Sequence, residues 1–191
     1  MQILVYFLSA FGLIAVAFIV FRVVVRRDYV RRQRLTALSS FLELLVWTLY
    51  MAFPYIYNPP QWALIWLPDV PVSATVRTLG LIGVFLGIAT AFGTMIWFGL
   101  QRAFGLEVSR LIRTGPYRVT RNPQVVGGTL MVVGTAVIWP SWYALGWVLL
   151  YFVVAHLMVI TEEEHLRDVF GEEYKEYCKR VPRYFGIARS R

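Results

Sequence analysis

The feature that most constrains this chain is a series of long apolar runs, separated by short polar or basic connections. The runs cover residues 2–25, 36–57, 74–100, 124–138 and 141–161. A helix needs about 20 apolar residues to cross a hydrocarbon core of about 30 Å, and all the runs but 124–138 are that long. Of the 191 residues, 58% are hydrophobic and only 16% are charged, which is atypical of a soluble domain. We therefore predict an all-α integral membrane protein with about five transmembrane helices, the last two forming a hairpin.

The positive charges are gathered in three segments that alternate with the apolar runs. Of the 19 Lys and Arg, six lie in 22–34, five in 102–121 and seven in 167–191. Because Lys and Arg resist translocation, these segments are predicted to face the cytoplasm, with the N-terminus outside. A cytoplasmic helical tail is expected at 162–179, and a prokaryotic inner membrane is the expected location. This distribution indicates membrane topology and attraction to lipid headgroups, and argues against nucleic-acid binding.

The same composition limits the other classes of site. A single cysteine excludes an internal disulfide, and two histidines are too few for a convincing metal centre, so no metal is expected. The first run lacks a basic segment before it and is predicted to be a retained anchor. We treat 1–191 as one membrane domain, in which 1–100 supplies three spans and 101–191 carries the chemistry.

The segment between the third and fourth runs offers a place for an anion. Gly115-Pro116 breaks the preceding basic segment, and Asn122-Pro123 suits the cap and first turn of a new helix. The N-terminus of that helix would present free N–H groups and a positive dipole end beside Arg121, which favours a carboxylate. Gly127 and Gly128 leave room there for a ligand or a partner helix.

Three consecutive glutamates, Glu162, Glu163 and Glu164, end the last apolar run and form the opposite pole. Adjacent helical residues point about 100° apart, so at most one or two of the carboxylates can face a pocket while the others face water or pair with basic residues. A carboxylate at the inner boundary can hold an ammonium group. Together the two segments could bind both ends of an amino-acid zwitterion.

At these residues the chain resembles the integral-membrane methyltransferases that include isoprenylcysteine carboxyl methyltransferase and the phospholipid methyltransferases. The resemblance covers about 110–185. It is carried by Gly115, Tyr117, Arg121-Asn122-Pro123, Gly127, Glu162-Glu163, Leu166, Phe170-Gly171-Glu172-Glu173-Tyr174, Tyr177 and Lys179-Arg180-Val181-Pro182-Arg183. The family's histidine is Asn122 here. Met158 stands where the isoprenylcysteine enzymes have an arginine, so the sequence indicates the reaction class better than the substrate.

The resemblance implies S-adenosyl-methionine as the methyl donor, bound at the inner face beneath the last hairpin. It implies a lipophilic or membrane-partitioned acceptor that arrives from the lipid bilayer. The charged, catalytic residues would be Glu163 and Arg121. The cofactor-binding residues would be Tyr117, Arg121, Asn122, Pro123, Gly127, Glu162, Glu163 and Tyr174. Phospholipid amine, prenyl thioether acid and small thiol acceptors stay open, and the competing hypothesis is a non-enzymatic membrane scaffold or small-molecule carrier.

Overall fold

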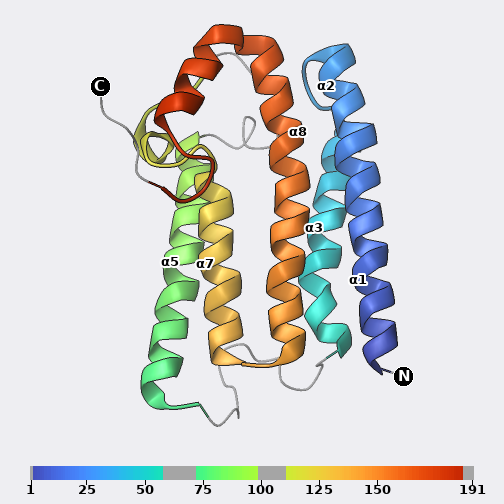
Figure 1. The fold of residues 1–191 in the computed structure, drawn as a ribbon, viewed down its shortest axis with the longest axis vertical. Coiled ribbons are helices and arrows are strands. Elements are labelled where there is room, and N and C mark those ends of the chain that lie inside the picture. Colours follow the sequence, from blue (N-terminus) through green and yellow to red (C-terminus); the bar gives the residue numbers. More distant parts are fainter. Residues whose placement is uncertain (1, 58–71, 99–110, 187–191) are drawn as a thin grey trace.

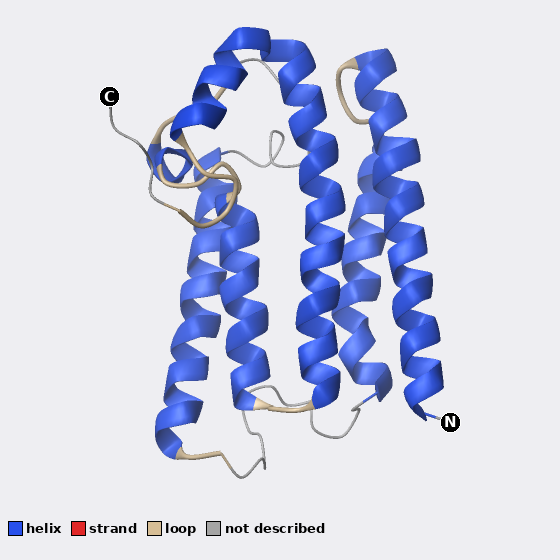
Figure 2. Cartoon of the chain, in the orientation of Figure 1, coloured by secondary structure: helices blue, strands red, loops and turns tan. Residues whose placement is uncertain are grey.

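All regular structure in residues 2–57, 72–98 and 111–186, the part that the computed structural model describes, is helical (Figure 2). The elements are α1 (Gln2–Phe18), the π-helix η1 (Ile19–Val25), α2 (Arg26–Arg32), α3 (Ala37–Tyr57), α5 (Ala74–Phe98), the 3₁₀-helix η2 (Gly115–Arg118), α7 (Pro123–Ile138) and α8 (Trp142–Arg180). They lie side by side with roughly parallel axes, α5 and α7 on one side and α3 and α1 on the other side of α8 (Figure 1). The connection at 58–71, which contains no Lys or Arg and for that reason is predicted to be an outer loop, and residues 101–110 of the basic segment are not among the described residues.

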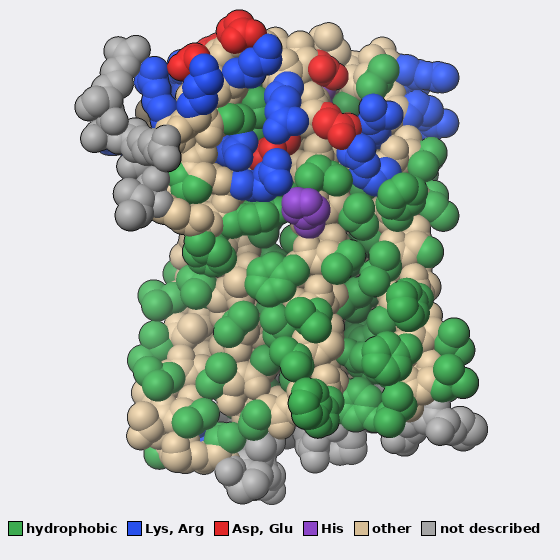
Figure 3. Space-filling model, viewed as in Figure 1, with side chains coloured by type: hydrophobic (Ala, Val, Ile, Leu, Met, Phe, Trp, Pro, Cys, Tyr) green, Lys and Arg blue, Asp and Glu red, His purple; other side chains and the backbone are tan. Residues whose placement is uncertain are grey.

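The helices identify an integral membrane protein. Four of the described helical stretches are long and apolar enough to cross a membrane: Ile3–Arg32, Ala37–Pro54, Ala74–Trp97 and Trp142–Arg180. The 16 residues of α7 span only about 24 Å, less than a typical hydrocarbon core. Large apolar side chains such as Phe11 and Ile96 are more than 60% exposed, and hydrophobic side chains cover most of the face in Figure 3. Basic side chains gather at the end where α8 bends.

The first apolar run continues into a helix that is longer than the sequence predicted. Helices α1, η1 and α2 follow one another without a break, so Arg26–Arg32, expected to be part of a loop, are helical. Arginine is a good helix former and no glycine or proline interrupts this stretch. The chain turns only at Gln33, whose φ of 54° is left-handed. The basic residues therefore extend the helix beyond its apolar part.

Helices α5 and α7 pack closely because glycines face each other across their contact. A Cβ atom added to Gly87 would lie 2.5 Å from the Gly127 carbonyl oxygen, and one added to Gly134 would lie 2.7 Å from the Gly80 oxygen. A Cβ on Gly83 would meet the Gly134 Cα at 3.3 Å. Gly80, Gly83 and Gly87 therefore allow close helix approach, since small residues let membrane helices touch through their backbones.

Helix α8 is a single 39-residue element that bends at Gly171. The sequence predicted a separate tail helix at 162–179, but the helix continues through Glu162 and the break comes nine residues later. Gly171 has φ 50° and ψ −122°, a conformation that residues with a side chain rarely adopt. The bend turns the last part of α8 across the end of the bundle, toward α7 (Figure 1).

We expect Gly171→Ala to destabilise the protein by about 1–2 kcal/mol, because alanine is strained at this positive φ. Nothing lies within 4 Å of a Cβ added at Gly171, so the cost is conformational and not steric. Gly93→Ala is the matched control: it lies inside α5, also with nothing within 4 Å of its added Cβ. There alanine should stabilise the helix slightly. Denaturation in mixed micelles measures both, and equal stability of the two variants would contradict the prediction.

Candidate functional site

A buried carboxylate lies at the centre of the polar end of the bundle. The Glu163 side chain is 3% exposed, and three arginines surround it. Arg121 Nη1 lies 3.0 Å from Oε1, and Arg167 Nη2 donates to Oε2 at 3.1 Å. Arg183 donates to both oxygens, from Nε at 3.0 Å and from Nη2 at 2.8 Å. Both carboxylate oxygens are thus satisfied by the protein, and the hydrogen bond to Glu163 raises the pKa of Arg183.

Arg121 comes from the short stretch before α7 and joins that stretch to the end of α8. Its Nη1 also donates to Cys178 Sγ at 2.6 Å, and its backbone N–H donates to the Pro182 carbonyl at 2.9 Å. The side chain is 11% exposed. Its Nε is buried and has no hydrogen-bond partner among the described residues. Buried donors are rarely left unpaired, so this N–H is available to a ligand or a water molecule.

The residues after α8, Val181–Gly186, form a strap that closes over the start of α7. The Arg183 carbonyl accepts hydrogen bonds from Thr120 Oγ1 at 3.1 Å and from Asn122 Nδ2 at 3.0 Å. The next residue, Tyr184, has its hydroxyl 3.1 Å from His156 Nδ1. The strap therefore ties the motif before α7 to the middle of α8.

Asn122 and Pro123 begin α7, but one expected detail is wrong. Pro123 occupies the first turn and Asn122 the cap position, as the sequence predicted. The Asn122 side chain makes no capping hydrogen bond, because its amide is turned toward the strap instead. Asn122 thus fixes the strap, and the first N–H groups of α7 receive no oxygen from it.

Tyr117 lies on η2, under the bent end of α8. Tyr177 donates its hydroxyl to the Tyr117 carbonyl at 2.7 Å, and the ring of Trp97 stacks on the Tyr117 ring with centroids 6.4 Å apart. Burial raises the pKa of the Tyr117 hydroxyl, and the negative charge of Glu162 adds to that effect. Glu162 and Tyr117, 45 residues apart, thus lie within electrostatic reach of each other. Tyr174, 1% exposed, packs beside Tyr177 in a small hydrophobic cluster.

The three consecutive glutamates face three different environments, as the helical geometry predicted. Glu163 points into the arginine cluster. Glu164 points toward α1 and α2, where it accepts from Arg22 at 2.8 Å and from Arg26 at 2.9 Å. Glu162 is exposed and makes no hydrogen bond or ion pair to any residue in the described ranges. Of the three, Glu162 is the carboxylate that is free to bind something else.

Two predicted roles change once the contacts are known. Arg121 and Glu163 were expected to grip opposite ends of a ligand, but they bind each other directly. Gly127 was expected to leave room for a cofactor or for a partner helix, and it meets the helix: a Cβ added to it would lie 2.6 Å from the Ala91 backbone nitrogen of α5. The absence of a side chain at Gly127 is therefore explained by its contact with α5. Among the other predicted residues, Tyr117, Asn122, Pro123 and Tyr174 all lie at the same end of the bundle.

Sequence reasoning missed part of the arginine cluster. Arg167 lies four residues after Glu163, a spacing at which opposite charges commonly pair on a helix, so this contact could have been predicted. Arg183 is part of the motif at 179–183, but the sequence predicted no partner for it. Nothing in the sequence pairs Tyr184 with His156. No group of three or more His, Cys, Asp or Glu in the described residues is arranged to hold a metal ion.

Two known proteins are similar in sequence to this chain. The chain is 29% identical over 117 residues to the nickel-cobalt-cadmium resistance protein NccN of Alcaligenes xylosoxydans, covering 61% of this chain and 53% of that protein. It is 28% identical over 156 residues to the cobalt-zinc-cadmium resistance protein CzcN of Cupriavidus metallidurans, covering 78% and 67%. The chain thus spans about half of the length of NccN and about two thirds of the length of CzcN. No solved structure matches it significantly.

A match to a whole family covers the part of the chain that contains the site. The sequence pattern of the phospholipid methyltransferases matches residues 70–173, which include α5, α7 and most of α8. This range contains Tyr117, Arg121 and the three glutamates, and it covers more than half of the chain. The fold of membrane helices and the position of the site agree with it, and the chain belongs to the phospholipid methyltransferase family.

Proposed function

We propose that the chain is an S-adenosyl-methionine-dependent methyltransferase that acts on a lipophilic acceptor at the cytoplasmic face of a membrane. The observation that carries the proposal is the ion pair between Arg121 and Glu163, 3.0 Å long and buried. It joins two motif segments that are 42 residues apart in sequence, at the basic end of the bundle. In this proposal Glu163 is a positioning residue, which fixes Arg121 and the strap around the donor site.

The residues that would hold the donor are those near this cluster that retain binding capacity. The donor's amino-acid part carries an ammonium and a carboxylate. The unpaired carboxylate of Glu162 suits the ammonium, and the buried, unpartnered Nε–H of Arg121 suits the carboxylate. The ring of Tyr117, close enough to Glu162 for its pKa to respond, would line the same space. The residues present fit the group.

When bound, S-adenosyl-methionine supplies an electrophilic methyl group on a sulfonium. Glu162 and Arg121 would hold it by its amino-acid part, and its methyl group could then pass to a lone pair of the acceptor in a displacement that leaves the neutral thioether. The protein's main contribution to such a displacement is alignment of the acceptor with the methyl group. Three arginines on one buried carboxylate provide a rigid base for that alignment.

The acceptor and the topology are part of the same proposal. Five membrane-crossing helices, with the α7–α8 pair as a hairpin, would bring all the described basic segments to the cytoplasm. Phospholipid amine acceptors are favoured by the family, whereas Met158 argues against carboxyl methylation. The names of the relatives concern metal resistance, and a methyltransferase acting on a membrane component is compatible with such a role. Residues 101–191 would carry the donor site, with α5 supporting it.

The proposal is tested by titrating the purified protein in detergent with S-adenosyl-homocysteine, using calorimetry. We expect Glu162→Gln to weaken binding about tenfold, because a hydrogen bond to a charged group is lost from the ligand. Glu164→Gln, two residues away and about 200° around the helix, should change the affinity little. Binding by the wild type that neither variant alters would contradict the assignment of Glu162. No binding by the folded wild type would favour the scaffold or carrier.

A further inference from the structure

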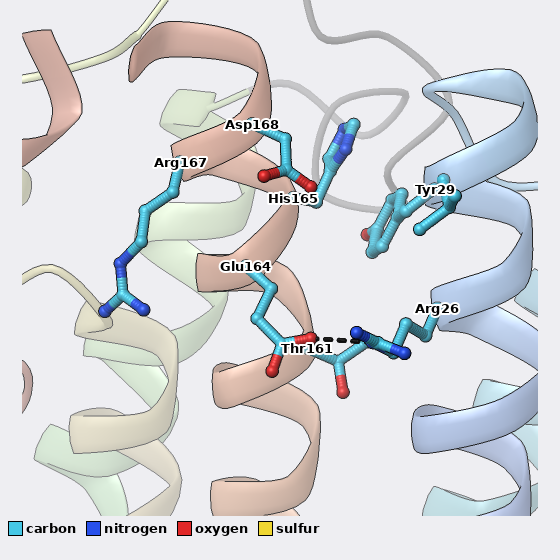
Figure 4. A pocket seen from close by; sticks show the side chains of 8 residues that line it. Arg26, Tyr29, Thr161, Glu164, His165, Arg167 and Asp168 are labelled. Atoms are coloured by element: carbon cyan, nitrogen blue, oxygen red, sulfur yellow. Dashed lines mark hydrogen bonds and ion pairs between the residues drawn. The ribbon is translucent and has the colours of Figure 1, made fainter. Parts of the chain in front are cut away.

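A polar cavity lies between α8 and α2, on the other side of α8 from the arginine cluster. Its volume is about 180 Å³. We call it the seam pocket and define it by Arg26 and Tyr29 of α2 and Thr161, Glu164, His165 and Asp168 of α8 (Figure 4). Arg167 borders it too, but its guanidinium points away from the pocket in Figure 4, toward its partner Glu163.

The seam pocket presents one available cation and one available anion. Arg26 uses Nε to bind Glu164 at 2.9 Å, and its side chain is 54% exposed, so the other guanidinium N–H groups face outward. Glu164 is already neutralised by Arg22 and Arg26. Asp168 is exposed and has no ion pair or hydrogen bond within the described part of the chain. The pocket therefore suits a ligand that carries both an anion and an ammonium group.

Aromatic rings form the wall between these charges. The Tyr29 and His165 rings are stacked, with centroids 4.1 Å apart and planes 3° from parallel. His165 is 4% exposed, and its Nε2 is buried without a hydrogen-bond partner among the described residues. Tyr29 is 9% exposed, and the stacked pair forms a rigid wall beside Asp168. An unpaired imidazole nitrogen adds a polar atom to the wall.

A separate apolar groove lies further along α8, between α8 and α1. It has a volume of about 190 Å³ and is lined by side chains of α1 and α8, among them Phe7, Ala10, Ile14, Leu149 and Val153. Val153 and Glu164 are 11 residues apart, close to three helical turns, so they lie on the same face of α8. The rise between them is about 16 Å, which an acyl chain can span. The polar pocket and apolar groove thus lie in line, head and tail.

We propose that this seam binds one glycerophospholipid whose headgroup carries an ammonium, as in phosphatidylethanolamine. Its phosphate would lie against Arg26, its ammonium against Asp168, and one acyl chain in the groove between α1 and α8. The site lies on a different side of α8 from the arginine cluster, because Glu164 points toward α1 and α2 while Glu163 points to Arg121 and Arg183. The lipid would act as a bound structural partner and not as the methyl acceptor, so the inference does not depend on the enzymatic activity.

Native mass spectrometry of the detergent-solubilised protein, titrated with defined lipids, tests the headgroup. We expect dipalmitoyl phosphatidylethanolamine to bind about tenfold more tightly than the phosphatidylglycerol with the same chains, because only the first pairs with Asp168. Asp168→Asn should abolish this preference, whereas Glu172→Gln, an exposed acidic residue one turn further on, should retain it. Arg26→Gln should weaken both lipids, and Arg31→Gln, an exposed arginine of α2 outside the pocket, should weaken neither by more than about twofold.

The acyl chain and the source of the headgroup are tested by two further ligands. Dihexanoyl phosphatidylethanolamine, whose chains are too short to fill the groove, and soluble phosphoethanolamine should each bind at least about tenfold more weakly than the dipalmitoyl lipid. Equal binding of the two dipalmitoyl lipids to the wild type would overturn the proposal. So would equal effects of Asp168→Asn and Glu172→Gln, or soluble phosphoethanolamine binding as tightly as the lipid.

Discussion

Glu163→Ala is expected to cost the folded protein about 3–5 kcal/mol, the largest effect of any single charge substitution in the described residues. The carboxylate binds Arg121, Arg167 and Arg183, and it is almost completely buried. Its removal leaves the Arg121 guanidinium, 11% exposed, without an anion. Arg167 and Arg183 are more exposed and can turn toward water, so most of the cost comes from Arg121.

The matched control is Glu173→Ala on the same helix. Glu173 pairs with Arg113 at 2.6 Å, but both side chains are 47% exposed. An exposed pair contributes about 0–1 kcal/mol, so this substitution should change stability little. Equilibrium unfolding in mixed detergent micelles measures both variants. A second test is the double variant Arg121→Ala with Glu163→Ala, which should be less destabilised than the sum of the single variants, because the unpaired charge is gone.

Two outcomes would contradict this account of the cluster. If Glu163→Ala and Glu173→Ala lost similar amounts of stability, Glu163 would not be the buried centre on which the arginines depend. If the double variant were as unstable as the sum, Arg121 and Glu163 would act independently. Either result would also remove the observation that carries the proposed function, because the two motif segments would no longer be joined through this pair.

Much of the helical architecture could be predicted because hydrophobic length and charge placement are local properties. The apolar runs at 36–57 and 74–100 correspond closely to α3 and α5. The predicted helix boundaries that were wrong lie in polar segments of the sequence. The arginine-rich segment 26–32 forms a helix as readily as a loop, and the glutamates at 162–164 continue α8 instead of ending it. In both cases only a residue with special backbone geometry, Gln33 or Gly171, ends or bends the helix.

The site could be predicted as a set of residues but not as a set of contacts. The resemblance brought Arg121 and Glu163 to the same end of the molecule, which the structure agrees with. Their direct pairing depends on how the strap and the bent end of α8 fold back, and these are long-range contacts that no local pattern encodes. The contacts of Glu162 and Glu164 are likewise not encoded by a local sequence pattern. Helical geometry predicts that they diverge, but only packing against α1 and α2 shows that Arg22 and Arg26 neutralise Glu164.

Gly87→Ala should destabilise the contact between α5 and α7 by about 1–3 kcal/mol, the usual cost of forcing extra atoms into a packed interior. The added Cβ would lie 2.5 Å from the Gly127 carbonyl oxygen and 2.5 Å from the Met131 nitrogen. Both are backbone atoms, so no side chain can rotate to make room and the two helices must separate. In a membrane the loss is serious, because helix association depends on close packing and not on the hydrophobic effect.

Gly93→Ala again provides the control, six residues further along α5, where a new Cβ meets nothing within 4 Å. The same substitution at Gly93 should be neutral or slightly stabilising, since alanine is the better helix former. Thermal unfolding in detergent compares the two variants, and Gly87→Ala should unfold several degrees lower. Because α7 begins at the Arg121 motif, separation of α5 from α7 should also weaken S-adenosyl-homocysteine binding. A Gly87→Ala protein as stable as Gly93→Ala would mean that the glycine contact does not hold α7, and with it the donor site, in place.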